Sequence, residues 1–132
     1  MREILFRGKR IDNGEWEYGG CVLTENKVCL IYNQTHSIDL QGFTVEENSV
    51  GQYTGLTDKN GEKIFEGDIV KHESGATVLF HKVVFERRNG CAYFGAVMGE
   101  YETWGFCNSF PPTLVEVVGN IYDNPELLEV SE

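Results

Sequence analysis

The sequence predicts a mainly β protein, formed either as a small antiparallel barrel, SH3-like or OB-like in character, or as two small packed sheets. Apolar and polar residues alternate with a period of two over several short segments, which is the pattern of half-buried strands. The 15 glycines fall largely at the expected hairpin ends, and no stretch carries the period of a long amphipathic helix. We therefore expect many short strands joined by tight turns.

The start of the chain predicts a β-hairpin followed by shorter strands. Residues 2–24 alternate on both sides of an Asp-Asn-Gly turn at residues 12–14, whose residue types tolerate a tight reversal. A bulge is expected in the second strand, at the glycine pair 19–20. The apolar run at residues 28–32 predicts another strand, and residues 38–50 hint at one more edge strand.

The middle of the chain carries the clearest local signals. Residues 50–56 and 64–70 predict strands, separated by a polar turn at residues 57–63 that is built around an Asn-Gly pair. The carboxylates of Asp58 and Asp68 are expected to accept backbone N–H groups of the bends in which they lie. These are folding roles.

The second half continues the up-and-down antiparallel pattern. Residues 76–85 and 91–98 predict two strands joined by a turn at residues 87–90, and residues 113–122 predict the last strand. The tail at residues 124–128 places a proline after an N-cap candidate and predicts one or two helical turns.

Length and cysteine use set the expected organisation and compartment. The 132 residues fit one domain, in which residues 1–50 form an N-terminal β-hairpin region packed on a β-barrel-like region over residues 51–132. There is no run of about 18 apolar residues and no signal-peptide pattern, which predicts a cytoplasmic protein. The four cysteines are then expected to be reduced, and they lack the close pairs typical of zinc sites. No metal and no cofactor are expected.

Charge disfavours one class of partner. The 11 basic and 21 acidic side chains give a net charge of −10, and such a surface repels phosphate backbones. The first ten residues are the exception, because four cations and one anion there sum to +3. The candidate basic edge consists of Arg2, Arg7, Lys9 and Arg10.

Aromatic residues crowd into residues 93–110, and the part after residue 98 is expected to form a loop or an irregular strand. Exposed rings on small β domains bind ligands, although the same rings can fill a core that has few leucines. The acids Glu100 and Glu102 favour a basic or proline-rich partner. The candidate binding surface is Tyr101, Trp104 and Phe106, with Trp104 the ring expected to be exposed.

Three separated segments resemble the YopX family of phage and prophage proteins. They are GQYTGLTDKNG at residues 51–61, IFEGDIV at residues 64–70 and VGNIYDNPELL at residues 118–128, and the opening at residues 2–7 also suits the family. The resemblance spans nearly the whole chain and implies one small, mostly β domain encoded in phage or prophage genomes. It implies no established biochemical activity and supplies no catalytic, cofactor or metal residues.

Three functions of different classes stay open. The leading one is a non-enzymatic phage accessory protein that binds a host or phage protein and can form a homo-oligomer through an exposed strand edge. The second is a nucleic-acid-associated SH3-like or OB-like module that adds Arg87 and Arg88 to the basic edge. An enzyme is not expected, because the sequence shows no nucleophile–base pair and no metal cluster. Only a pocket that unites a cysteine with a histidine, such as Cys107 with His72 or His81, would favour one.

Overall fold

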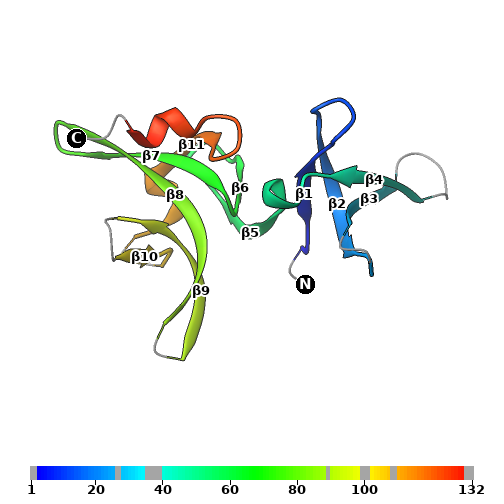
Figure 1. Cartoon of the computed structure of the whole chain (residues 1–132). Coiled ribbons are helices and arrows are strands. Elements are labelled where there is room, and N and C mark those ends of the chain that lie inside the picture. The colour runs from blue at the N-terminus through cyan, green and yellow to red at the C-terminus, as the bar shows by residue number, and fades with distance from the viewer. Residues whose placement is uncertain are drawn as a thin grey trace. The chain divides into compact units, whose positions relative to one another are not determined.

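The chain forms two antiparallel sheets, and neither closes into a barrel (Figure 1). The computed structural model describes residues 3–25, 28–34, 40–88, 90–98, 102–107 and 110–129. The mainly β prediction is confirmed, and of the two predicted architectures the structure has the sheets. None of the helical turns in the described residues is long and apolar enough to cross a bilayer.

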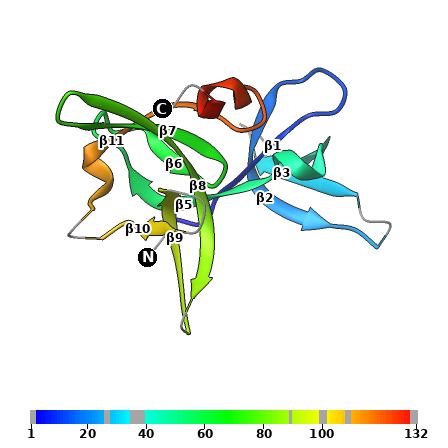
Figure 2. The same cartoon turned by 60° about the vertical axis from the view of Figure 1, so that its left-hand side comes forward.

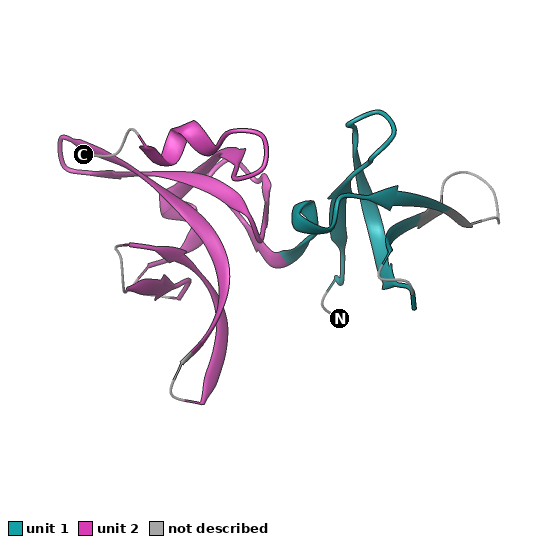
Figure 3. Ribbon diagram, in the orientation of Figure 1, with its two compact units in different colours: residues 1–53 teal, residues 54–132 magenta. Residues whose placement is uncertain are grey.

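The chain divides into two compact units, residues 1–53 and residues 54–132, which Figure 3 colours separately. In unit 1 the strands lie in the order β4-β3-β2-β1-β5, and a short 3-10 turn, η1, precedes β5. Their bounds are β1 (Phe6–Lys9), β2 (Trp16–Leu23), β3 (Cys29–Gln34), β4 (Leu40–Val45), η1 (Glu47–Ser49) and β5 (Gly51–Thr57).

The predicted hairpin at the start of the chain is confirmed, since β1 and β2 pair from Phe6↔Gly19 to Lys9↔Trp16. The turn between them contains Gly14, whose φ of 75° suits glycine. At the predicted bulge the register shows none: β2 leaves β1 after Gly19 and begins to pair with β3 at Gly20. The glycine pair therefore marks a change of partner strand.

The core of unit 1 is small and lies between strands that are far apart in the sequence. Cys29, Ile31 and Val45 are buried, and Phe6 and Val50 pack against them. Alternation along each strand sends these side chains to one face of the sheet.

Unit 2 contains a five-stranded sheet in the order β10-β9-β8-β7-β11, and Figure 2 shows its strands from a second side. β5 pairs with β1 through Gly51 and Gln52, and its sheet continues to β6. The bounds are β6 (Lys63–Phe65), β7 (Asp68–Ser74), β8 (Thr77–Arg88), β9 (Cys91–Val97), β10 (Thr103–Gly105), η2 (Pro112–Leu114), β11 (Val115–Asn120) and η3 (Pro125–Glu129).

The tail prediction and the strands predicted at residues 50–56, 76–85, 91–98 and 113–122 are confirmed within a few residues. Residues 64–70 instead form β6 and the start of β7, separated by a turn at residues 66–67. The stretch after residue 98, expected to be a loop or irregular strand, contains the three-residue strand β10. The tail forms the 3-10 turn η3. The core of this unit consists of Ile64, Val70, Val83, Ala96, Phe110 and Val115, and it lies against one face of the five-stranded sheet.

Candidate functional site

One face of the five-stranded sheet gathers histidines and aromatic rings, and we call it the inner face. His72 and His81 are diagonal neighbours on β7 and β8. Val83, two residues beyond His81, pairs with Ala96, which pairs in turn with Trp104 of β10. Because paired residues of an antiparallel sheet point to the same face, all these side chains share the inner face.

Phe110 is the centre of an aromatic cluster on the inner face. Its side chain is buried, and its ring meets His72 edge-on at 5.4 Å and Trp104 edge-on at 5.7 Å. Phe106 stacks on it at 5.6 Å. Two reciprocal backbone hydrogen bonds of 3.1 Å between Cys107 and Phe110 hold the loop that carries it. These centroid distances lie in the range in which aromatic pairs stabilise one another.

Trp104 is the member of the cluster that solvent reaches, with 45% of its surface exposed. It lies on the edge strand β10, and its edge-on contact with buried Phe110 limits the orientations of its ring. Phe106 is half-buried, and Tyr101 lies outside the described residues. A held, exposed indole offers a broad apolar surface and one N–H donor, which suits recognition of a protein segment.

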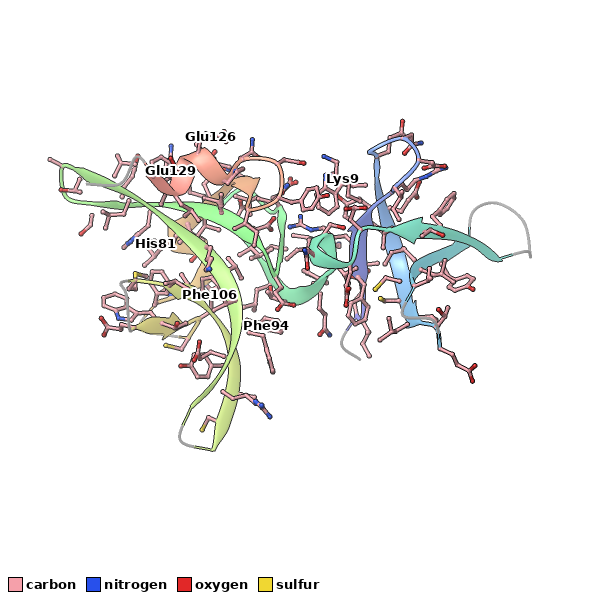
Figure 4. The ribbon with its side chains drawn as sticks, viewed as in Figure 1. Lys9, His81, Phe94, Phe106, Glu126 and Glu129 are labelled. Carbon is pink, nitrogen blue, oxygen red and sulfur yellow. The ribbon has the colours of Figure 1, made fainter. Side chains whose placement is uncertain are left out.

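The histidine pair adjoins the aromatic cluster, because the His72 ring contacts Phe110 and His81 lies next to His72; we call the two rings the histidine floor. His81, labelled in Figure 4, is 6% exposed, and its Nδ1 lies 2.9 Å from the backbone oxygen of Val97. That carbonyl can only accept, so Nδ1 carries the proton. Burial lowers the pKa of His81, and the nearby His72, at a ring distance of 5.9 Å, lowers it further. The ring is therefore neutral at pH 7.

Two ring nitrogens of this floor have no hydrogen-bond partner among the described residues: His72 Nδ1 and His81 Nε2. The thiol of Cys107 is exposed and makes no hydrogen bond to either ring in the part of the chain that the structure describes. Within those same ranges no group of three or more potential metal ligands occurs. The inner face therefore offers apolar and aromatic contacts from rings whose orientations are restricted by their neighbours.

Comparison with known proteins places the chain in a family. Residues 5–129 match the family model described as YopX protein. The chain belongs to the YopX family. The resemblance seen in the sequence is therefore confirmed over nearly the whole chain.

A solved structure with a similar fold is the crystal structure of protein EF1440 from Enterococcus faecalis. It aligns with a TM-score of 0.55 and 22% sequence identity, over 97% of this chain and 99% of that chain. At this identity the likeness speaks for the fold alone. A search of curated proteins gives no match.

Two carboxylates hold the fold together within the YopX segments, which are residues 51–61, 64–70 and 118–128. Asp58 is 4% exposed, and its carboxylate accepts the backbone N–H groups of Asn60 (2.8 Å), Glu62 (2.9 Å) and Val117 (2.8 Å). The first two bonds close the turn after β5, and the third ties that turn to β11. The expectation that Asp58 accepts backbone N–H groups is confirmed, and its bond to Val117 reaches further than the local role predicted.

The second carboxylate of these segments, Asp68, also accepts a backbone N–H, and Gly119 leaves room for the side chain of Asn124. Asp68 is 1% exposed and accepts the N–H of Phe65 at 2.7 Å, within the bend that was predicted. A Cβ added at Gly119 would lie 2.6 Å from the Asn124 side-chain oxygen, which itself accepts the N–H of Asn120 at 3.2 Å. The YopX segments thus supply turns and ties between strands of unit 2.

The candidate basic edge in unit 1 is largely engaged within the protein. Arg7 is 7% exposed, with its guanidinium carbon 4.9 Å from the centre of the Trp16 ring. Arg10 forms a bidentate ion pair with Asp12, at 2.9 and 2.8 Å, and a third contact with Glu17 at 3.2 Å. Lys9, labelled in Figure 4, is half-buried, and Arg2 lies outside the described residues.

Arg10 and Asp12 each stabilise the charged form of the other. The hydrogen bonds to the guanidinium lower the pKa of Asp12, and the carboxylate of Asp12 raises the pKa of Arg10. A guanidinium matched by two carboxylates has little charge left for a phosphate.

Sequence reasoning named Trp104 and Phe106 but missed the organising role of Phe110 and the floor of histidines. His81 lies two residues before Val83 in a β-rich run, and this spacing could have placed it on the core face with Val83. No local signal marks Phe110 as the centre, because its contacts come from β7, β10 and the loop before it.

Proposed function

We propose that this protein is a non-enzymatic protein-binding module that recognises its partner through Trp104 on the inner face. The observation that carries the proposal is the combination of 45% exposure with an edge-on contact to buried Phe110. A ring held in this way loses little freedom on binding, and tryptophan is enriched among residues that dominate binding energy. Phe106, stacked on Phe110, extends the same apolar surface.

The charge around Trp104 supports a basic or proline-rich segment as the partner. Glu102 is exposed two residues before Trp104, and Glu100, outside the described residues, adds a second acid to this part of the sequence. Unit 2 carries 13 acidic and 6 basic side chains, a net charge of −7. Such a surface attracts cationic segments and repels nucleic acid.

The biological setting belongs to the same proposal. The YopX family supports an origin in a phage or prophage genome, and hence a role in the cytoplasm of a bacterial host as an accessory protein. Self-association into a homo-oligomer through a strand edge is a further prediction, which light scattering on the purified chain tests.

Affinity capture of the tagged full chain from induced or infected cells, with mass spectrometry, tests the proposal. Trp104→Ala removes the exposed ring, and loss of a central aromatic contact of this kind costs about 2 kcal/mol or more, or roughly thirtyfold in affinity. Tyr18→Ala is the matched control, because Tyr18 is equally exposed, at 45%, but lies on β2 of unit 1.

We expect to recover one stoichiometric partner protein, with or without nuclease treatment. Tyr18→Ala should still capture this partner, and Trp104→Ala should not. Recovery that depends on nucleic acid would favour the nucleic-acid alternative. Equal recovery by both variants would show that Trp104 is not the recognition residue.

A further inference from the structure

The hairpin of β8 and β9 extends beyond the rest of the unit 2 sheet, as Figures 1 and 2 show. β8 pairs with β7 only as far as Lys82, while its pairing with β9 continues to Arg88↔Cys91. On the far side, β10 pairs with β9 only over residues 95–97. The outer part of β8, residues 84–88, is thus a strand with β9 on one edge and no described strand on the other, and we call it the arm.

The direction of the backbone groups on the arm follows from one hydrogen bond. The carbonyl of Val83 accepts the N–H of Gly67 at 2.9 Å, so Val83 turns its backbone groups away from β9. Because this direction alternates along a strand, Phe85 and Arg87 turn theirs to the same open edge, while Glu86 bonds to β9. The arm therefore presents the N–H and C=O groups of Phe85 and Arg87 to an incoming strand.

The side chains of the arm indicate what kind of strand fits. Phe85 is 48% exposed and contacts Phe94 of β9 at 5.0 Å, so an apolar pair lies beside the open edge. The arm contains two cations, Arg87 and Arg88, and one anion, Glu86, a local charge of +1 in a chain of net charge −10. Arg87 is exposed and forms no ion pair with any described residue.

We propose that the arm binds an extended acidic peptide segment of a partner protein as an added β-strand along the open edge of β8. Main-chain hydrogen bonds to Phe85 and Arg87 supply the affinity of such strand addition, and side chains supply its selectivity. An apolar residue opposite Phe85 and an acidic residue opposite Arg87 match the arm. The open edge of β8 lies two strands away from β10, which carries Trp104, so this site goes beyond the proposed function.

Nucleic acid fits the arm less well. The arm carries only two cations, and Glu86 stands next to them, so few phosphates could be neutralised. An open hydrogen-bonding edge is recognised by another backbone, and among the described residues no strand pairs with this edge of the arm.

Selection of nonapeptides from a random display library on the immobilised full chain tests this proposal. Arg87→Pro removes the outward N–H without touching the bonds to β9, because the N–H of residue 87 points to the open edge. Arg87→Glu leaves the backbone intact and reverses the charge, which covers the case in which the proline variant fails to fold. Trp104→Ala separates this surface from the one in the proposed function.

We expect enriched peptides that carry an apolar and an acidic residue two positions apart, bind Arg87→Pro and Arg87→Glu at least about tenfold more weakly, and bind Trp104→Ala as well as they bind the wild type. The proposal is overturned by a library that yields no binder, by peptides that bind all three variants equally, or by peptides that depend on Trp104 alone. Binding of a DNA duplex that is lost in Arg87→Glu would equally overturn it.

Discussion

Replacing Asp58 by asparagine tests the claim that the YopX segments hold unit 2 together. The Asp58 carboxylate accepts three backbone N–H groups and is 4% exposed. Asparagine keeps one oxygen, which can still accept from Asn60 and Glu62, but its NH₂ group then faces the N–H of Val117, 2.8 Å from the present oxygen. One charge-assisted bond is lost and two are weakened.

The cost of Asp58→Asn follows from these bonds. A hydrogen bond to a charged group contributes about 1.5–3 kcal/mol, and neutral acceptors bond about half as strongly. We expect a loss of about 3–6 kcal/mol, which is a large share of the roughly 5–15 kcal/mol that stabilises a typical domain. The melting temperature should fall by about 10 °C or more.

Circular dichroism melting and hydrogen exchange at the Val117 amide measure the effect. Asp12→Asn makes the same substitution at a carboxylate with 67% side-chain exposure and should leave the melting temperature close to that of the wild type. The structural role assigned to Asp58 is refuted if Asp58→Asn melts at the same temperature as Asp12→Asn. It is refuted equally if the Val117 amide stays protected from hydrogen exchange in Asp58→Asn.

Three further outcomes follow from the packing of unit 2. The pKa of His81 is lowered by burial below its ordinary value of about 6.5, so the unfolded chain takes up the proton first; stability should fall as the pH drops from about 7 to 5, and His81→Phe should flatten that pH profile in urea titrations. Phe110→Ala should cost about 3–5 kcal/mol and, in a Trp16→Phe background in which Trp104 is the one remaining tryptophan, broaden the emission, while unchanged emission would argue against the edge-on contact. Gly95→Ala should cost about 1–3 kcal/mol, because the new Cβ lies 2.5 Å from the Trp104 carbonyl oxygen; Gly20→Ala, with nothing within 4 Å, should be nearly neutral in the same melts.

The turns and bends could be predicted from the sequence because residues close together in the chain form them. The turn before β2 and the turn after β5 each place a glycine at positive φ, Gly14 at 75° and Gly61 at 82°, where the sequence predicted them. Asp68 bonds to Phe65, three residues away, so its role also lies within one bend. Short-range rules suffice for features of this kind.

The choice between a barrel and open sheets, and the composition of the inner face, depend on distant pairings. β8 pairs first with β7 and then with β9, and nothing in its alternation marks Lys82 as the residue where the partner changes. Asp58 bonds to Val117 across 59 residues. Phe110 meets His72 and Trp104 only because the register brings them to one face. A single sequence holds no signal for such contacts.

The dissociation constant of the captured partner, measured by isothermal titration calorimetry with the wild type, Trp104→Ala and Tyr18→Ala, tests the central claim most directly. If the inner face is the recognition surface, Trp104→Ala binds roughly thirtyfold more weakly and Tyr18→Ala binds within about twofold of the wild type. Equal affinity for the wild type and Trp104→Ala would contradict the account.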